Sequence, residues 1–309
     1  GFGDIQFARF DKKTILDLIV GTDIVFCQSI GPIGMMTINQ AHKSGVPAIA
    51  FIHSVDWELA SKSIKRGRRL AQWFVKRLAR KLYNKCARII VPGDDISTLL
   101  QHIGITTRME KVMLGVDTTH FTPSADKHAS KMAVGIDPHL TVIGFVGRIA
   151  REKNLGTLQT AFDQVHAQHK QTLLLIVGEG LRNEIRAGPD VKVTGMVDDV
   201  NAYLQAMDIY VSPSLTETSS LATMEAMACA LPVIVTPVGS IPDYVTHEKN
   251  GWFFSRRDVA DLSRKINYLI EKPALRSKLG VNARATIERQ YNWDRTADSI
   301  TKILRDVKK

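Results

Sequence analysis

The chain lacks the features of a membrane-spanning protein and of a disulfide-rich one. No apolar run in its 309 residues approaches the roughly 18 needed to cross a bilayer. The opening "GFGDIQFARFDKK" has neither the charge order nor the apolar block of a signal peptide. We therefore expect a cytoplasmic protein. The only cysteines, Cys27, Cys86 and Cys229, show no paired-thiol spacing, which argues against disulfides and a structural zinc site and predicts that all three fill the core.

Acidic residues are scarce relative to basic ones in the first part of the chain and nearly balance them in the second. The length suits two α/β domains, and 44% apolar residues suit a filled core. Residues 1–124 hold 17 basic and 10 acidic groups, whereas residues 125–309 hold 24 and 21. A basic excess attracts a polyanion, which can be nucleic acid, an anionic membrane surface or a phosphorylated substrate.

Short β-branched runs alternate with amphipathic helical stretches, a pattern typical of a doubly wound α/β sheet. Three buried strands are expected in the first part, at 23–28, 46–53 and 87–93, with helices at 36–45 and 59–88. From about residue 140 the alternation restarts with five strands, at 141–147, 172–180, 191–197, 208–213 and 232–237. We expect two domains, 1–125 and 126–290, and a C-terminal helix over 291–309 that could cross back to the first.

Two cations follow the first strand of the second domain. "GFVGRIAREKN" puts Arg148 and Lys153 in the loop that leaves a buried strand, and strand carboxyl ends form the ligand crevices of open α/β sheets. Arginine can clamp two phosphate oxygens and lysine adds a mobile charge, so the pair suits a diphosphate. The alternative, that both are solvated loop residues, stays open on spacing alone.

Two acids, Glu217 and Glu225, flank the start of a predicted helix, "LATMEAMACA". Glu217 lies in the loop before it and Glu225 about one turn inside, so both can face one crevice. The positive end of the helix makes an anion site there, and two carboxylates beside it would accept hydroxyls of a sugar and a ribose. Alternatively, Glu217 is an ordinary helix-start acid and Glu225 is the buried partner of a lysine.

The motifs "GRIAREKN" and "LLIVGEG", followed by residues 191–254, make the chain resemble the family 4 retaining glycosyltransferases with the GT-B fold. The resemblance covers most of 112–295 and continues more weakly before it. It implies two Rossmann-like, doubly wound parallel-sheet domains facing a cleft: an N-terminal acceptor domain, here incomplete, and a C-terminal nucleotide-sugar domain.

The resemblance also implies roles for individual residues. In the family, the positions of Glu217 and Glu225 contact the transferred sugar and the nucleotide ribose, those of Arg148 and Lys153 neutralise the diphosphate, and that of His53 lies on the aglycone side. His53 would orient or polarise the sugar, although a strand-end histidine can also be purely structural. The expected donor-binding set is Gly147, Gly195, Met196, Val197, Thr218, Ser219, Ser220, Leu221 and Glu225.

The chain departs from the family pattern at three places. No first strand with a Gly-rich, diphosphate-contacting loop precedes Gly1, so we expect a fragment or a late start, with weak nucleotide binding and little transfer. Thr218, Ser219 and Ser220 stand where Gly-Phe-Gly is common, which puts the sugar fit in doubt. Ala230 replaces the usual glycine before Leu-Pro, a change we expect to be tolerated.

The mechanism implied by the resemblance needs no metal. Breaking a glycosyl–diphosphate bond builds negative charge on the leaving phosphate, which Arg148, Lys153 and helix-end N–H groups stabilise most in the transition state. The sugar would be attacked on its front face, with the departing phosphate helping to deprotonate the acceptor. We expect no cofactor other than a UDP- or GDP-sugar co-substrate.

The stretch 59–88 contains 11 basic residues and no acid. At 100° per residue, an apolar stripe for packing on the sheet comprises Ala71, Phe74, Val75, Leu78, Leu82 and Cys86. Trp73 projects into the opposite, basic face, and indole beside cations is typical of a membrane interface. The expected membrane-binding residues are Lys62, Lys65, Arg69, Trp73, Lys76 and Arg80. An ordinary solvated face remains the alternative.

The expected acceptor depends on whether the basic excess attracts nucleic acid, an anionic membrane surface or a phosphorylated substrate. No RNA-binding signature is visible and only one ring lies on the basic face, which argues against nucleic acid. Many lipid glycosyltransferases of this fold dock on anionic membranes through a basic helix, so we expect a peripheral enzyme with a membrane-lipid acceptor. A soluble sugar or glycan acceptor, a nucleotide-sugar-binding pseudoenzyme and an epimerase remain alternatives. The pattern does not fix donor base, sugar, linkage or oligomeric state.

Overall fold

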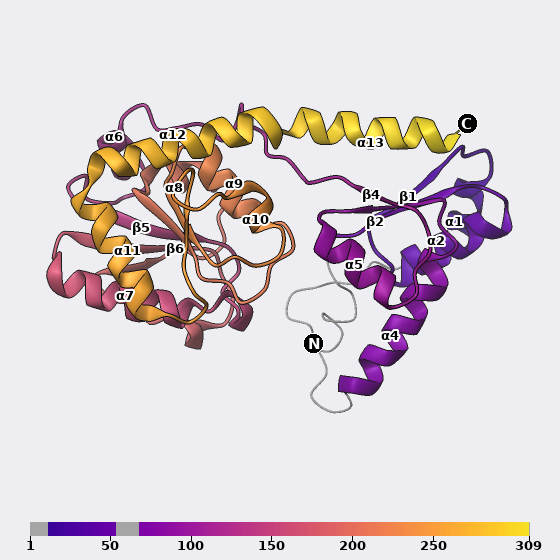
Figure 1. Ribbon diagram of the computed structural model, residues 1–309, viewed down its shortest axis with the longest axis horizontal. Coiled ribbons are helices and arrows are strands. Elements are labelled where there is room, and N and C mark those ends of the chain that lie inside the picture. The colour runs from indigo at the N-terminus through magenta and orange to yellow at the C-terminus, as the bar shows by residue number, and fades with distance from the viewer. Residues whose placement is uncertain (1–11, 54–67, 309) are drawn as a thin grey trace. The chain divides into compact units, whose positions relative to one another are not determined.

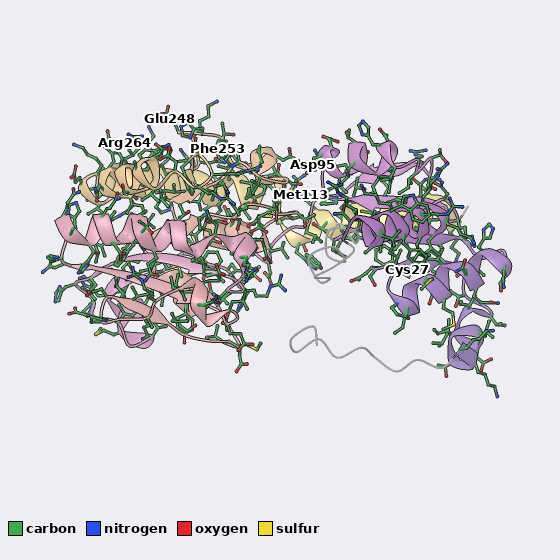
Figure 2. The ribbon with its side chains drawn as sticks, turned by 90° about the horizontal axis from the view of Figure 1, so that it is seen from below. Cys27, Asp95, Met113, Glu248, Phe253 and Arg264 are labelled. Atoms are coloured by element: carbon green, nitrogen blue, oxygen red, sulfur yellow. The ribbon has the colours of Figure 1, made fainter. Side chains whose placement is uncertain are left out.

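The computed structural model describes residues 12–53 and 68–308, and the chain divides into two compact units (Figure 1). Unit 1 comprises Gly1–Met113 and Ala297–Lys309, and unit 2 comprises Leu114–Thr296. Each unit has its own hydrophobic core. Figure 2 marks unit 1 by Cys27, Asp95 and Met113, and unit 2 by Glu248, Phe253 and Arg264.

Unit 1 is built on a parallel sheet in the order β1-β2-β3-β4. Its strands are β1 (Val25–Cys27), β2 (Ala48–Phe51), β3 (Arg88–Val91) and β4 (Met109–Lys111), and its helices are α1 (Lys12–Ile19), α2 (Pro32–Lys43), α4 (Arg68–Tyr83) and α5 (Asp94–His102). Every residue of β2 is buried. Parallel strands read as continuous apolar runs because helices cover both faces of the sheet.

The sheet of unit 2 has the order β10-β9-β8-β5-β6-β7, and all its pairs are parallel. Its strands are β5 (Thr141–Val146), β6 (Thr172–Val177), β7 (Val191–Val193), β8 (Ile209–Ser212), β9 (Val233–Val235) and β10 (Trp252–Phe253). Counted from β5, this is the 3-2-1-4-5-6 order of the Rossmann fold. The order reverses between β5 and β8, which places a ligand crevice at their carboxyl ends.

The helices of unit 2 are α6 (Lys127–Ala133), α7 (Leu155–Gln168), α8 (Asn201–Ala206), α9 (Leu221–Ala228), α10 (Ile241–Tyr244), α11 (Val259–Glu271) and α12 (Pro273–Gln290), with short 3-10 turns η1 (Arg151–Lys153) and η2 (Arg182–Glu184). Ile143 and Phe145 of β5 share a core with α7 and α11. Gly144, between them, points the other way, where a Cβ would lie 2.1 Å from the sulfur of Met207. The missing side chain therefore lets the α8–β8 connection pack directly on the sheet.

Helix α13 (Trp293–Lys308) carries the chain from unit 2 back into unit 1. On the unit 2 side, the backbone of Val116 accepts from Trp293 and donates to Tyr291, so the two crossing segments run side by side. On the unit 1 side, Lys308 bonds Asp23 at 2.8 Å. The first residues of α13 thus belong to unit 2, and its residues from Ala297 on belong to unit 1.

Two expectations about strands were wrong. Unit 1 has four described strands rather than three, and unit 2 has six rather than five. The missed strands are β4, with the sequence Met-Glu-Lys, and β10, with only Trp252 and Phe253. Both lie at a sheet edge, where a strand can be short and polar, so neither has the apolar run that identified the others.

Candidate active site

The loops after β5 and β8 are joined at the switch point of the unit 2 sheet. The backbone N–H of Leu215 donates to the carbonyl of Glu152 at 2.8 Å, and the Asn154 amide donates to the carbonyl of Pro213 at 3.2 Å. Asn154 has a left-handed φ of 54° and ends η1 where α7 begins. The cation-bearing loop and the glutamate-bearing loop therefore form one surface.

Lys153 and Glu217, from these two loops, make a close ion pair. The Nζ–Oε1 distance is 2.6 Å, and both side chains are largely buried. The hydroxyl of buried Ser214 donates to the same carboxylate oxygen at 2.6 Å. A carboxylate that accepts two strong bonds is held in one orientation, with the lysine charge beside it.

Arg148 behaves differently from Lys153. Its side chain is 65% exposed and pairs with Glu152 at 3.0 Å, one turn further along the loop. An exposed ion pair of this kind contributes little stability, so the guanidinium can exchange partners at small cost. The two predicted diphosphate ligands thus lie on the same loop, one fixed and one exposed.

The loop between Glu217 and α9 is held by the segment that follows β9. Gly239, at φ 56°, approaches so closely that a Cβ would lie 2.3 Å from the Glu217 carbonyl oxygen. Ser240 donates its N–H to the Thr218 carbonyl at 2.8 Å, and the Tyr244 hydroxyl donates to the Ser219 carbonyl at 3.0 Å. This packing fixes the backbone of the loop just before Leu221, which opens α9.

Serine at position 220 adopts a conformation that favours glycine. Its φ is 53°, and its hydroxyl bonds the Thr223 hydroxyl at 2.8 Å rather than capping a backbone N–H of α9. Ala230, at the other end of the helix, has φ 56°. Of the three positions where this sequence has lost a family glycine, Ser220 and Ala230 keep the left-handed backbone, and Thr218 does not.

Glu225 lies one turn into α9, with its carboxyl group largely buried. Burial raises its pKa from 4.5 to about 7, and the positive charge of nearby His120 opposes the rise. No ion pair to Glu225 exists among the described residues, so the alternative of a buried lysine partner does not hold within them. A carboxyl group with a pKa near neutrality is typical of a functional crevice.

The loops after β5, β6 and β7 meet beside this site. Gly147 and Gly178, with φ of 145° and 139°, pack so closely that a Cβ on Gly178 would lie 2.1 Å from the Gly147 carbonyl oxygen. Gly178 also bridges Gly195, the residue before Met196. Met196 is 76% exposed and Val197 is half-buried. The exposed apolar side chain of Met196 at this edge suits contact with a nucleobase.

His53 belongs to unit 1, at the carboxyl end of β2. Its ring packs on Phe51 with centroids 4.2 Å apart, and burial lowers its pKa below the usual histidine value. Its Nε2 atom is buried and makes no hydrogen bond to any part of the chain that the structure describes. A neutral ring with an unsatisfied nitrogen can bond a ligand hydroxyl.

The basic stretch forms a helix in its described part, α4, whose buried side passes through Val75, Ala79 and Leu82. Phe74 was expected in that stripe, but its side chain is 62% exposed. It precedes Val75 by one position, about 100° around the helix, so it lies outside the buried stripe. Cys86 is buried beyond the helix end, and Lys62 and Lys65 lie outside the described residues.

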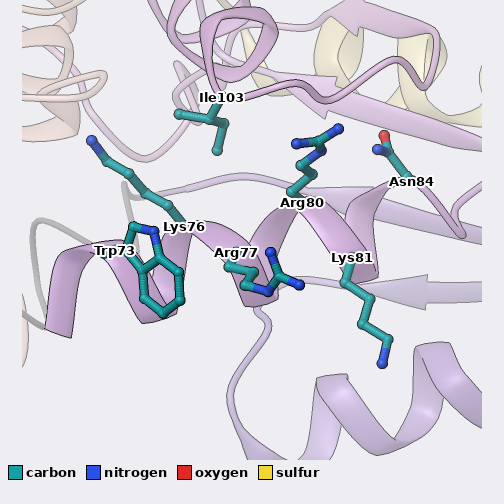
Figure 3. Close-up of a pocket in the computed structure, with 7 residues that line it drawn as sticks. All are labelled: Trp73, Lys76, Arg77, Arg80, Lys81, Asn84 and Ile103. Carbon is teal, nitrogen blue, oxygen red and sulfur yellow. The ribbon is translucent and has the colours of Figure 1, made fainter. Parts of the chain in front are cut away.

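Leu70, Trp73 and Phe74 are exposed apolar side chains on the first turns of α4. Figure 3 shows Trp73 and the cations that follow it on the helix. A groove of about 630 Å³ is lined by Trp73, Lys76, Arg77, Arg80, Lys81, Asn84 and Ile103. The Arg77 guanidinium lies 5.9 Å from the centre of the Trp73 ring. Arg69 is exposed but does not line the groove. An exposed tryptophan among cations is the arrangement that the sequence predicted.

Four residues of the site were missed by the sequence analysis: Ser214, Glu152, His120 and Asp199. His120 bonds Asp199 at 3.0 Å and acts on Glu225. The signal available in the sequence was "DTTH", since Asp followed by Thr is typical of an Asx turn that fixes the residue after it. Within residues 12–53 and 68–308, no cluster of metal-ligating side chains and no helix long and apolar enough to span a membrane is present.

A known protein family matches most of each unit. The family described as "Glycosyltransferase Family 4" matches residues 3–120, and the one described as "Glycosyl transferases group 1" matches residues 141–272. The chain is 26% identical over 297 residues to the alpha-monoglucosyldiacylglycerol synthase of Acholeplasma laidlawii, covering 90% of this chain and 72% of that protein. It is 27% identical over 303 residues to a GDP-mannose-dependent monoacylated alpha-(1-6)-phosphatidylinositol monomannoside mannosyltransferase of Corynebacterium glutamicum, covering 92% and 76%.

Solved structures agree on the fold. Sucrose-phosphate synthase from Thermosynechococcus elongatus superposes with a TM-score of 0.80 at 20% identity, covering 96% of this chain and 78% of that one. Anabaena HepE in complex with UDP and glucose also gives 0.80, at 18% identity, covering 95% and 80%. With two Rossmann-like units, each matched by a glycosyltransferase family, the chain belongs to the family 4 glycosyltransferases of the GT-B fold.

Proposed function

We propose that this glycosyltransferase moves a sugar, with retention of anomeric configuration, from a nucleotide sugar to a hydroxyl of a membrane lipid. The observation that carries the proposal is the meeting of Arg148, Lys153, Glu217 and Glu225 at the switch point of the unit 2 sheet. That position is where Rossmann-type sheets bind nucleotides. The same residues are those whose roles the family resemblance assigns.

In the proposed reaction, Arg148 and Lys153 stabilise the negative charge that develops on the departing diphosphate. Both cations act more strongly in the transition state than before it, because the charge grows as the glycosyl bond breaks. Glu217, held by Lys153 and Ser214, accepts hydroxyls of the transferred sugar. Glu225 accepts the ribose hydroxyls, and the 195–197 segment holds the base. His53 bonds the sugar from the acceptor domain.

Because cationic side chains neutralise the leaving group in this scheme, we expect transfer without a divalent metal. EDTA should leave the rate of transfer within about twofold of the untreated enzyme, a change too small to represent the loss of a Lewis acid. The measurement is the initial rate with and without EDTA after extensive dialysis. Loss of turnover that added Mg²⁺ restores would overturn the metal-free mechanism.

A lipid acceptor is supported by two observations. The two relatives described above are named for glycolipid products or acceptors. Helix α4 presents Leu70, Trp73 and Phe74 beside a groove lined by four cations, the composition of a helix that lies in a membrane interface. We infer that the enzyme is peripheral and approaches an anionic membrane through α4.

A soluble acceptor is the second candidate, because other relatives are named for one. D-inositol 3-phosphate glycosyltransferase of Corynebacterium jeikeium is 26% identical over 71% of this chain, although the match covers 57% of that protein. In that case the basic face of α4 would attract an anionic acceptor instead of a membrane. A binding-only protein or an epimerase of the same fold would share the donor site but transfer nothing.

One screen separates these candidates. UDP-, GDP- and ADP-sugars are incubated with total lipid extract or with soluble sugars and sugar phosphates, and the anomeric configuration of any product is read by NMR. Transfer to lipid with retention supports the proposal, and transfer only to soluble acceptors supports the second candidate. Glu217→Gln should lower turnover by about 100-fold or more, whereas Glu248→Gln, on an exposed loop, should not. If the protein binds or isomerises a nucleotide sugar without transferring the sugar, it would be a binding-only protein or an epimerase.

A further inference from the structure

Glu217 uses only one of its two carboxylate oxygens to bind the part of the chain that the structure describes. Its Oε1 accepts from the Lys153 ammonium at 2.6 Å and from the Ser214 hydroxyl at 2.6 Å. Its Oε2 makes no hydrogen bond to any described residue, and 11% of the side chain remains exposed. Because each carboxylate oxygen accepts about two hydrogen bonds, Oε1 is fully used and Oε2 is available to a ligand.

Ser214 follows β8 at the switch point, and its backbone is fixed by bonds from neighbouring segments. The carbonyl of Pro213, the residue before it, accepts from the Asn154 side chain at 3.2 Å. Its own carbonyl accepts from the hydroxyl of Thr236, which follows β9. Ser214 and Thr236 are both completely buried. The hydroxyl that donates to Glu217 therefore has a set position.

The two donors to Glu217 differ in what they fix. Lys153 carries a point charge on a flexible four-carbon chain, so it attracts the carboxylate but sets its rotation only weakly. The Ser214 hydroxyl lies on a short, buried side chain with little freedom, and its bond selects the oxygen that faces the protein. Without that bond, either oxygen of Glu217 would pair with Lys153, and neither would have a set position toward the sugar.

Lys153 can keep its bond to Glu217 while it binds a diphosphate. An ammonium group has three hydrogen-bond donors, and Glu217 takes one of them. The Lys153 side chain is 19% exposed, which leaves the remaining donors for a phosphate oxygen. Oε1 of Glu217 then stays occupied when the donor is bound, and a sugar hydroxyl has to use Oε2.

We propose that Ser214 is a positioning residue of the donor site, which holds Oε1 of Glu217 and thereby presents Oε2 to a hydroxyl of the transferred sugar. The inference rests on the proposed function, in which Glu217 contacts that sugar. It predicts that Ser214 affects binding of the sugar and not of the nucleotide, because other residues hold the base, the ribose and the diphosphate. The bond between Ser214 and Glu217 is itself a property of the unliganded protein.

The first test compares a nucleotide sugar with the bare nucleotide. Dissociation constants of UDP-glucose and UDP, and of GDP-mannose and GDP, are measured calorimetrically for the full chain and for Ser214→Ala. The variant should bind the nucleotide sugar about fivefold more weakly, as expected for one lost hydrogen bond, and the nucleotide within about twofold of the parent. Equal weakening of both ligands would show a purely structural role and overturn the proposal, as would unchanged binding of both.

Ser263→Ala is the matched control for this measurement. Ser263, on α11, is a buried serine whose hydroxyl also donates to a side chain, that of Gln164, at 2.9 Å. Its loss should leave the ratio of the two dissociation constants unchanged.

Ser214→Cys is the second variant, in case alanine disturbs the loop. Its thiol fills the place of the hydroxyl but is a weak hydrogen-bond donor, so the nucleotide sugar should again bind more weakly while the nucleotide does not. Parent-like affinity for the nucleotide sugar in Ser214→Cys would overturn the proposal.

The second test needs no ligand. Urea unfolding, followed by a probe in unit 2, is measured for Ser214→Ala, Glu217→Ala and the double variant. Ser214→Ala should lower the parent midpoint by about 0.5 M or more, because a hydrogen bond to a charged group is lost. In the Glu217→Ala background, the same substitution should move the midpoint by less than about 0.2 M, since the acceptor is already absent.

The outcomes separate the role of Ser214 from the proposed function. Equal midpoint losses in the two backgrounds would show that Ser214 does not hold Glu217, and would overturn this inference alone. If neither nucleotide sugar binds the parent, the proposed function fails and the sugar contact fails with it.

Discussion

At the scale of single residues, burial of the Glu225 carboxyl group favours the neutral acid, whereas its proposed role in accepting ribose hydroxyls needs the carboxylate. Glu225 has a folded-state pKa raised to about 7 against an ordinary value of 4.5. A raised carboxyl pKa means that the folded state favours the neutral acid. Its contribution to stability is therefore complete below pH 4.5 and is lost as the pH rises through 7.

We expect Glu225→Gln to show this directly. At pH 8 the unliganded variant should be more stable than the parent, by up to about 3 kcal/mol, and the difference should vanish at pH 4.5. Urea unfolding followed by a probe in unit 2 measures the difference at each pH. Equal stabilities of parent and variant at pH 8 would show that the carboxylate is solvated. Nucleotide-sugar affinity should fall in the same variant.

Ala230 allows a second prediction, about backbone conformation. Alanine at φ 56° is strained by about 1 kcal/mol, and glycine in that conformation is not. Ala230→Gly should raise the free energy of unfolding by about 0.5 kcal/mol, since the gain is partly offset by the extra chain entropy of glycine. Ala226→Gly, the same substitution inside α9, should instead destabilise by about 1 kcal/mol. Thermal or urea unfolding distinguishes the two signs, and destabilisation by both would refute the strain argument.

At the scale of secondary-structure elements, the sequence predicted the strands that are recognisable as buried apolar runs. It missed the contacts that depend on how these elements pack against one another. Strands such as β6, with all six residues buried, were visible as apolar runs. The pair Lys153 and Glu217 was placed in the correct loops because both follow strand ends, but their mutual bond needed the register of β5 against β8. His120 was missed because 79 residues separate it from Asp199, and no local pattern specifies such a contact.

Helix α4 leads to the third prediction. Trp73 and Phe74 are 59% and 62% exposed at its start, so replacing both by alanine should remove about 2 kcal/mol or more of interfacial binding and weaken vesicle partitioning at least tenfold. Leu18→Ala with Val20→Ala, also exposed in unit 1, is the matched control and should change partitioning little. Sedimentation with phosphatidylglycerol vesicles measures both. Equal losses in the two double variants would mean that α4 has no special contact.

At the scale of the whole molecule, the net positive charge lies entirely in unit 1. Unit 1 contains 21 basic and 11 acidic residues, which accounts for the full +10 of the chain, whereas unit 2 contains 20 of each. The C-terminal segment 297–309 contributes to this division, since it adds four basic and two acidic groups to unit 1. Long-range attraction to an anionic surface should therefore act on unit 1 and leave the nucleotide unit without a comparable pull.

The last prediction tests whether the α4 cations promote vesicle binding through their position or only through the net charge of the protein. Arg77→Gln, Arg80→Gln and Lys81→Gln together remove three cations from the α4 groove, and Lys249→Gln, Arg256→Gln and Arg257→Gln remove three exposed cations from unit 2. Both triple variants have the same net charge. Each cation near an anionic surface contributes on the order of 1 kcal/mol, so the α4 variant should lose vesicle binding at low salt by about 100-fold.

The unit 2 variant should bind vesicles like the parent, and nucleotide-sugar affinity should stay unchanged in the α4 variant. Parent binding should also fall steeply between 20 and 500 mM salt, because the attraction decays within a Debye length of roughly 10 Å at 0.1 M. Equal losses in the two triple variants would show that net charge alone drives association. In that case α4 would be an ordinary solvated face, and the soluble acceptor would become the better-supported substrate.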